Sequence, residues 1–167
     1  MAFSRSAQLI TSIALLALGL GWYLREQSRG QPTFLSQQTT LLPQTQLELV
    51  EPCSRQAPLG ISGTWVPTTN DVVEAESLLK TYVATHLNRP LTKYYRQYIG
   101  LLINDKKVLY INGFERPDSR PIEESLAEWK SRYISICDGG DAAWGVEFYI
   151  REKTFRNFAR NASPFAK

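Results

Sequence analysis

The sequence predicts an α+β fold in which a membrane helix comes first and one main helix then packs on an antiparallel sheet of four to five strands. Three observations support this prediction: an apolar run at residues 9–24, helical spacing of apolar residues over 71–87, and strand-like alternation after residue 94. A helix with one apolar stripe and a sheet with an apolar face bury these surfaces against each other. The main helix is therefore expected to cover one face of the sheet.

The apolar run at residues 9–24 follows Arg5. About 20 apolar residues cross a bilayer comfortably and about 17 is near the minimum, so two interpretations remain open. In the first, the run is a transmembrane signal-anchor and residues 1–8 stay in the cytoplasm. Trp22 and Tyr23 favour this interpretation, because their amphipathic rings prefer the membrane interface. In the second, the run is a signal peptide that is cleaved.

Both interpretations place the rest of the chain outside the cytoplasm. Residues 25–56 are rich in Gln, Ser, Thr and Pro and show no sustained period, which predicts a linker. An extracytoplasmic α+β domain then spans residues 57–167. The chain has two cysteines, Cys53 and Cys137, and an even pair in an oxidising compartment predicts a disulfide bond between them.

Apolar residues recur at three- and four-residue spacing over residues 71–87, which predicts the main helix. Asp71, followed three residues later by Glu74, resembles a capping box at the start of this helix. Residues 94–114 alternate aromatic and β-branched side chains on both sides of a polar centre, which predicts a β-hairpin. Further elements are expected as a short helix at 117–130 and strands at 133–137, 142–150 and 154–158.

The string C-D-G-G-D, which begins at Cys137, predicts a two-residue hairpin loop. Gly139 and Gly140 suit the positive φ angles of such turns. Asp138 and Asp141 would then face each other as turn-forming residues. Two functional alternatives remain open: a weak calcium site, and a carboxylate pair for acid–base chemistry.

The register of this predicted hairpin leaves a question open. Cys137 and Trp144 lie on one face of it, whereas Ile134 and Ile136 lie on the other face. Either a bulge shifts the register, or the sheet is covered on both faces.

Charge and motif content exclude several classes of function. A net charge of +3 with interleaved acids gives no basic face of the kind that nucleic-acid binders carry. Two cysteines and His86 do not supply the four ligands of a structural zinc site. The sequence has neither a phosphate-binding loop nor an H-E-x-x-H motif. The chain is therefore expected to bind no nucleic acid, metal or cofactor, and not to be an enzyme.

The string C-D-G-G-x-x-x-W-G-V-E-F runs from Cys137 to Phe148, after Y-Y-R-Q-Y-I-G from Tyr94 and K-K-V-L-Y-I-N-G-F from Lys106. Together these strings resemble a group of small exported proteobacterial proteins of unknown function. The resemblance covers about residues 94–161. It implies a bacterial envelope protein, but no activity and no site residues. Together with the apolar run at residues 9–24, it predicts a protein anchored in the inner membrane with its domain facing the periplasm, or released into the periplasm after cleavage. The order of helix and strands is also similar to cystatin-like and NTF2-like folds, although the Q-x-V-x-G loop of cystatin inhibitors is absent.

These features predict a membrane-tethered envelope domain that binds a protein or cell-wall partner, or is an accessory subunit of a membrane complex. Exposed aromatic side chains would form its binding face, because aromatic residues contribute much of the binding energy at interfaces. The candidates are Tyr94, Tyr98, Tyr110, Trp129 and Tyr149. For each of them the alternative is a place in the core.

A second hypothesis is a small periplasmic hydrolase or ligand-binding cup. It requires three carboxylates to converge on one pocket, where they would act in acid–base chemistry or hold a ligand. These are Asp138, Asp141 and Glu147.

Overall fold

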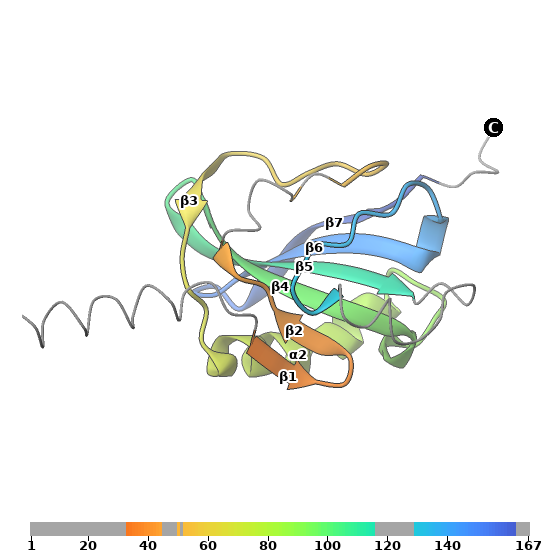
Figure 1. Cartoon of the computed structure of the whole chain (residues 1–167), viewed down its shortest axis with the longest axis horizontal. Coiled ribbons are helices and arrows are strands. Elements are labelled where there is room, and N and C mark those ends of the chain that lie inside the picture. The colour runs from red at the N-terminus through yellow and green to blue at the C-terminus, as the bar shows by residue number, and fades with distance from the viewer. Residues whose placement is uncertain (1–32, 45–49, 51, 116–128, 163–167) are drawn as a thin grey trace, which may run out of the picture. The chain divides into compact units, whose positions relative to one another are not determined.

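The computed structural model describes residues 33–44, 50, 52–115 and 129–162, which all belong to one compact unit over 32–167. One long helix lies against a sheet of seven strands, so the predicted α+β class is confirmed (Figure 1). The helix is α2 (Thr69–Ala84), and two 3-10 turns are η2 (Leu91–Lys93) and η3 (Gly140–Ala142). The strands are β1 (Thr33–Ser36), β2 (Thr39–Leu41), β3 (Ile61–Thr64), β4 (Tyr94–Ile103), β5 (Lys106–Glu115), β6 (Ala143–Tyr149) and β7 (Thr154–Arg160).

The sheet is mixed and has the order β1-β2-β4-β5-β6-β7, with β3 paired to β4 beside this row. β4 to β7 form an antiparallel meander. The other edge of β4 is shared: β2 runs parallel to residues 96–98, and β3 runs antiparallel to residues 101–103. The prediction of an antiparallel sheet of four to five strands is therefore wrong in two respects. The observed sheet has seven strands, and its β2–β4 pairing is parallel.

The additional strands β1 and β2 lie inside residues 25–56, which were predicted to be a linker. Each is at most four residues long, and a register irregularity separates Phe34 from Ser36 in their pairing. Such short, irregular strands give too few alternations for a strand pattern to emerge from the sequence. The stretch from Thr33 to Leu42 therefore belongs to the folded domain.

The apolar face of the main helix is confirmed: Val72, Ala75, Leu79 and Val83 are buried. The predicted start was three residues too late. Thr68 is the N-cap, its hydroxyl accepts from the Asp71 amide at 3.3 Å, and the Asp71 carboxylate accepts from the Thr68 amide at 2.7 Å. This reciprocal pair is a capping box in which Asp71 is the third helical residue, not the cap.

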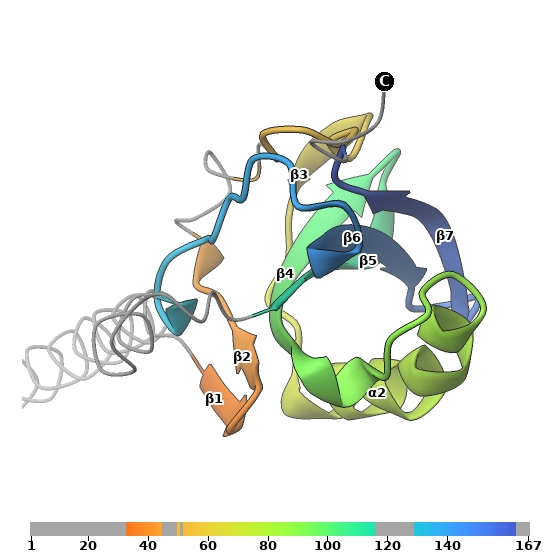
Figure 2. The same cartoon turned by 90° about the vertical axis from the view of Figure 1, so that its right-hand side faces the viewer.

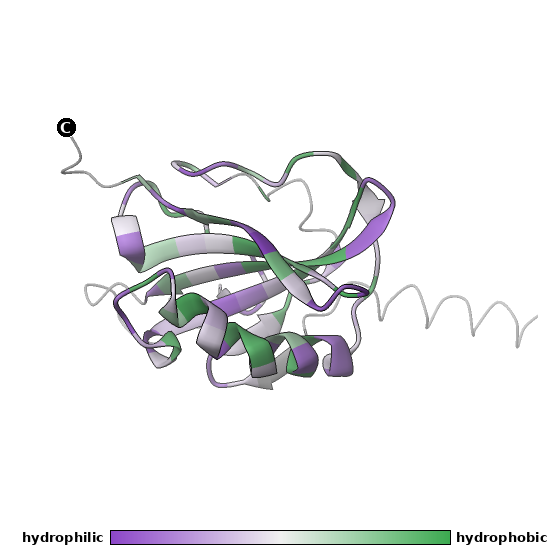
Figure 3. Ribbon diagram, turned by 180° about the vertical axis from the view of Figure 1, so that it is seen from behind, coloured by the Kyte–Doolittle hydropathy of each residue, from purple (hydrophilic) through white to green (hydrophobic). Residues whose placement is uncertain are grey.

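α2 lies against the concave side of the curved strands β4–β7 (Figure 2), and apolar and polar bands alternate along it (Figure 3). Side chains of a strand alternate between the two faces of a sheet, so every second residue of the meander faces the helix. The core on this face comprises Tyr94, Tyr98, Leu109, Ile111, Trp144, Val146 and Phe148 with the helix residues given above.

The second face of the sheet is also covered, by two segments, 52–59 and 129–137: Arg55 donates to Tyr110 and Asn112 of β5, and Trp129 and Tyr133 pack with residues of the sheet. Residues 133–137 are not a strand, as was predicted, but an irregular segment. Ile134 and Ile136 pack from this segment against the cluster of Phe114, Trp129 and Ala143, which answers the question of register: the sheet is covered on both faces. Most of the short helix predicted at 117–130 lies outside the described residues.

The disulfide bond between Cys53 and Cys137 is present and joins the two covering segments. A disulfide is typical of proteins outside the cytoplasm, so an extracytoplasmic location is supported. Within the described ranges, no helix combines the length and the apolar character needed to span a membrane. The predicted span at residues 9–24 lies outside those ranges.

The Gly-Gly string is a turn, but not a two-residue hairpin loop. Gly139 has a φ of 91° and precedes η3, which leads directly into β6. Such a left-handed conformation costs glycine little. The Asp138 amide donates to Ser54 Oγ at 2.7 Å, and the Gly140 amide donates to the Ala162 carbonyl at 3.1 Å. The turn thus connects the disulfide region to the end of β7.

Candidate functional site

The aromatic residues predicted to form an exposed binding face are core residues. Their exposed fractions are 0% for Tyr94 and Tyr98, 3% for Tyr110, 2% for Trp129 and 7% for Tyr149. They also lie on two different faces of the sheet, because Tyr94 and Tyr98 face α2 whereas Tyr110 and Tyr149 face away from it. A sheet covered on both faces leaves no open surface for these rings.

The three carboxylates of the second hypothesis do not converge. Asp138 is exposed, and Asp141 accepts from Arg160 Nη1 at 2.9 Å. Glu147 is buried in the middle of β6, roughly 15–20 Å along the chain from Asp141 at strand spacing. Within the described ranges, no cluster of three or more His, Cys, Asp or Glu side chains could hold a metal ion.

A partly buried polar network holds the covering segments on the second face. Arg55 Nη2 donates to Asn112 Oδ1 at 2.6 Å, and Arg55 Nη1 donates to Asn161 Oδ1 at 2.6 Å. The hydroxyls of Tyr110 and Tyr133 accept from the same guanidinium at 3.2 and 3.1 Å. These acceptors are all neutral, so Arg55 acts here as a multidentate hydrogen-bond donor that fixes the segment after Cys53 to the sheet.

Gln97 extends this network to the second covering segment. Its Nε2 donates to the carbonyls of Trp129 and Arg132, both at 2.6 Å. Its Oε1 accepts from Asn112 Nδ2 and from the Ile134 amide, both at 2.9 Å. All of the hydrogen-bonding capacity of this fully buried amide is therefore used to hold residues 129–134 in place.

One pocket lies beside this network, and we name it the Glu147 pocket. It has a volume of about 350 Å³. Its lining consists of Gln56, Ala57, Pro58, Leu59, Tyr110, Gly145, Glu147, Asn157, Phe158 and Ala159. Glu147 is 3% exposed, and its Oε2 accepts from Tyr149 Oη at 3.0 Å and from Asn157 Nδ2 at 2.9 Å.

A β-bulge in β7 places Asn157 in the wall of this pocket. The pairing of β6 with β7 is irregular between Gly145 and Glu147, and Asn157 has a φ of 54°. Asparagine is one of the few non-glycine residues that tolerate this conformation. Bulges are frequent next to functional sites, where they re-aim a side chain, and this one accompanies the Asn157 contact with Glu147.

A second pocket lies on the other face of the sheet, and we name it the α2 pocket. Its volume is about 380 Å³. It is lined by Gln38, Glu76, Lys80, Ala84, Arg89, Pro90, Leu91, Thr92 and Arg96. These residues come from the β1–β2 turn, α2, the chain from Arg89 into η2, and the start of β4.

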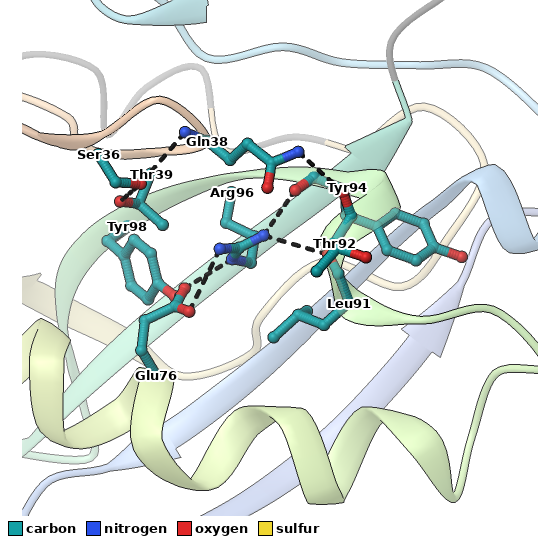
Figure 4. Close-up of polar contacts among 9 residues, drawn as sticks. All are labelled: Ser36, Gln38, Thr39, Glu76, Leu91, Thr92, Tyr94, Arg96 and Tyr98. Carbon is teal, nitrogen blue, oxygen red and sulfur yellow. Dashed lines mark hydrogen bonds and ion pairs between the residues drawn. The ribbon is translucent and has the colours of Figure 1, made fainter.

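The floor of the α2 pocket is an ion pair between helix and sheet (Figure 4). Arg96 Nε and Nη2 donate to the two carboxylate oxygens of Glu76 at 2.6 and 3.2 Å. Arg96 Nη1 donates to the carbonyls of Tyr94 and Leu91 at 2.6 and 3.2 Å. The Tyr98 hydroxyl donates to Glu76 as well. Burial, followed by the nearby Glu76 charge, raises the pKa of the Tyr98 phenol well above its usual value.

The β1–β2 turn closes one side of this pocket. Gln38 Nε2 donates to the Thr92 carbonyl at 2.8 Å, and the Gln38 carbonyl accepts from the Arg96 amide at 2.8 Å (Figure 4). The turn itself is held by a 2.5 Å hydrogen bond between the Ser36 and Thr39 hydroxyls. A segment predicted to be part of the linker thus forms a wall of the pocket.

Sequence reasoning singled out Glu147 but missed Arg55, Arg96 and Lys80. For Arg96 one signal was available: the Y-Y-R-Q-Y-I string puts a charged residue among apolar positions of a predicted strand, and a buried charge requires a partner. For Arg55 and Lys80 no such signal exists, because arginine and lysine in a loop or on a helix are usually exposed.

Comparisons of the chain with models of protein families, with curated proteins and with solved structures gave no significant match. The resemblance of residues 94–161 to exported proteobacterial proteins stays a prediction.

Proposed function

We propose that this chain is a non-catalytic binding domain of the bacterial envelope that recognises a protein or cell-wall partner through a carboxylate-terminated peptide held in the α2 pocket. The observation that carries this proposal is the excess of positive charge in the pocket. Its lining contains three cationic side chains, Lys80, Arg89 and Arg96, and one anionic side chain, Glu76. A concave site whose lining carries a net positive charge attracts anionic ligands.

Lys80 is the group available to a ligand. It follows Glu76 by four residues, a spacing at which glutamate and lysine usually pair on a helix. Here Glu76 is engaged by Arg96 and Tyr98 instead. Within the described part of the chain, the Lys80 ammonium has no carboxylate partner. Arg89 pairs with Glu115 through Nη1 at 2.5 Å, which leaves its other nitrogens as donors.

The remaining lining suits a short peptide end with small apolar side chains. Ala84, Pro90 and Leu91 supply apolar surface beside the charged groups, and about 380 Å³ falls within the usual range of ligand pockets. Glu76 already accepts hydrogen bonds from Arg96 and Tyr98, so it is poorly suited to act as a general base. These features favour binding over catalysis.

The proposal is tested by titrating the full chain in detergent micelles with N-acetyl-alanyl-alanine and with its C-terminal amide, followed by NMR shifts of backbone amides. We expect the acid to shift residues of the α2 pocket and the neutral amide not to do so. Lys80→Gln should weaken binding of the acid about three- to tenfold, since it removes one exposed charge contact. Arg151→Gln is the matched control, because Arg151 lies in the exposed turn after β6.

Equal binding of the acid and the amide, or equal binding by the Lys80→Gln variant and the unchanged chain, would contradict the carboxylate site. The location is tested separately. A phosphatase fused after Lys167 requires export for activity, and we expect it to be active in bacteria. A silent phosphatase with an active cytoplasmic reporter at the same place would overturn the envelope part of the proposal.

A further inference from the structure

We propose a second binding site in this domain, at the Glu147 pocket, which takes an alkylammonium group such as a lysine side chain. The starting observation is a buried carboxylate without a cation. Glu147 is 3% exposed, and the Tyr149 hydroxyl and the Asn157 amide, both neutral, donate to its Oε2. Within the described part of the chain, its Oε1 accepts no hydrogen bond. A buried charge held by neutral donors alone is costly to a fold.

The two neighbouring arginines do not form ion pairs with Glu147 in the described part of the chain. The Arg55 guanidinium donates to Asn112, to Asn161 and to the hydroxyl of Tyr110. Arg156 is opposite Glu147 in the register of β6 and β7, but its guanidinium lies over the Tyr149 ring, 4.6 Å from the centroid. Neither arginine forms an ion pair with Glu147 in the described structure, so a positive group from a ligand is the missing partner.

The shape of the pocket suits an ammonium on an alkyl stem. The ammonium offers three donors, one of which can reach Oε1. Tyr110 also lines the pocket, and aromatic rings attract cations. Ala57, Pro58 and Leu59 also line the pocket and provide apolar surface for the stem, and Leu59 is 66% exposed.

The space above the sheet depends on the absence of a side chain at Gly145. A Cβ at this position would overlap the Tyr110 hydroxyl and come within 2.9 Å of Arg55 Nε. Glycine therefore permits the Arg55 network and the pocket to lie side by side. Two local features therefore shape the pocket around the Glu147 carboxylate: the glycine at position 145 and the bulge at Asn157.

This site is independent of the α2 pocket, because Glu147 and Arg96 lie on opposite faces of the sheet. The probe is n-butylammonium, with n-butanol as a neutral control of similar size, titrated into the full chain in detergent micelles. Amide shifts are followed at Gly145, Glu147 and Asn157. We expect n-butylammonium to shift these residues in a saturable manner and n-butanol to have no saturable effect there.

Glu147→Gln keeps the size of the side chain and an acceptor for Tyr149 and Asn157, while it removes the charge. We expect it to weaken n-butylammonium binding at least about tenfold, as loss of one partner of a buried charge pair does. Glu152→Gln removes the same charge from the exposed turn after β6 and should bind as the unchanged chain does. Absence of binding by the unchanged chain, or equal binding by the Glu147→Gln variant, overturns the proposal.

A stability measurement distinguishes a ligand site from a structural carboxylate. If Glu147 serves a ligand, Glu147→Gln should leave the melting temperature equal or higher, because an uncompensated buried charge has been removed. If Glu147 serves the fold, the same substitution should lower the melting temperature by several degrees. A clear decrease together with unchanged n-butylammonium binding would assign Glu147 to the fold and overturn the proposal.

Discussion

Arg96 on β4 and Glu76 on α2 form a two-pronged ion pair, in which the guanidinium donates to both carboxylate oxygens at 2.6 and 3.2 Å. The Arg96 side chain is 8% exposed and that of Glu76 is 26% exposed. A buried arginine that loses its anion is left as an uncompensated charge. The pair is therefore expected to be sensitive to the loss of either member.

Glu76→Gln should lower the free energy of unfolding by about 2–3 kcal/mol, since it leaves Arg96 buried without a counter-charge. The measurement is urea unfolding followed by circular dichroism. Glu74→Gln, two residues earlier on the same helix, is the matched control. Glu74 pairs with Lys153 at the surface, and loss of an exposed pair should cost less than about 0.5 kcal/mol. Similar costs for both substitutions would contradict the buried character of the Arg96 pair.

Because several tyrosine side chains are buried, we expect the free energy of unfolding to decrease at alkaline pH. Burial, followed by the Glu115 charge, raises the pKa of Tyr94 to about 12. Burial likewise raises the pKa of Tyr98 and of Tyr133 above the usual value. In the unfolded chain these phenols ionise near pH 10. Above that pH the unfolded state has lost protons that the folded state keeps, so the free energy of unfolding falls as the pH rises.

We expect this decrease to begin near pH 9–10 and to approach about 1.4 kcal/mol per pH unit for each such tyrosine. Tyr98→Phe removes one of these phenols, so it should reduce the slope of the free energy of unfolding against pH by the contribution of one tyrosine. Unfolding titrations at several pH values measure the slope, and a spectrophotometric titration of the phenolates reports which tyrosines resist ionisation. Stability that stays constant up to pH 11 would contradict the burial of these rings.

Gly113 on β5 lies directly beneath the Trp144 ring, and a Cβ there would overlap the ring atoms. Gly113→Ala should therefore destabilise the fold by about 2–3 kcal/mol, because a packed core cannot move aside cheaply. Gly63→Ala is the matched control in another strand, since its Cβ would meet Leu102 at an ordinary 3.5 Å. Thermal unfolding of both variants tests the difference, and a neutral Gly113→Ala would mean that Trp144 is packed elsewhere.

The Cys53–Cys137 disulfide closes a sequence separation of 84 residues. Replacing both cysteines by serine should lower the free energy of unfolding by about 2–4 kcal/mol, with about 4–5 kcal/mol as the upper limit for so long a loop. Non-reducing peptide mapping should recover the two cysteines in one linked peptide pair. Free thiols at both positions in protein taken from the envelope would contradict the bond.

Regular, long elements were predictable from the sequence because their patterns are long enough to be recognised. The apolar stripe of α2 and the hairpin of β4 and β5 each extend over many residues. β1 and β2 were missed because they are short and irregular. Residues 133–137 were predicted as a strand from their apolar alternation, yet this alternation packs Ile134 and Ile136 against the cluster of Phe114, Trp129 and Ala143. The sequence of such a segment alternates as a strand does, so only its tertiary contacts distinguish the two.

The binding sites were less predictable than the fold. Exposed and buried tyrosines look alike in a sequence, and the second cover of the sheet, which buries Tyr110 and Tyr149, comes from distant segments. Glu147 was recognised as a candidate but was grouped with Asp138 and Asp141 because they are close in sequence. The α2 pocket depends on the Gln38 turn, and only tertiary structure brings this turn next to Thr92.

The parallel pairing of β2 with β4 has a consequence for the order of folding. β4, β5 and β6 each pair with the next strand along the chain, whereas Thr39 pairs with Arg96 across the whole of β3 and α2. Closing so long a loop costs entropy that local hairpins do not incur. We therefore expect the meander to form early and the β1–β2 turn to dock late. The α2 pocket is complete only after this docking, so a carboxylate ligand would select chains that have finished folding.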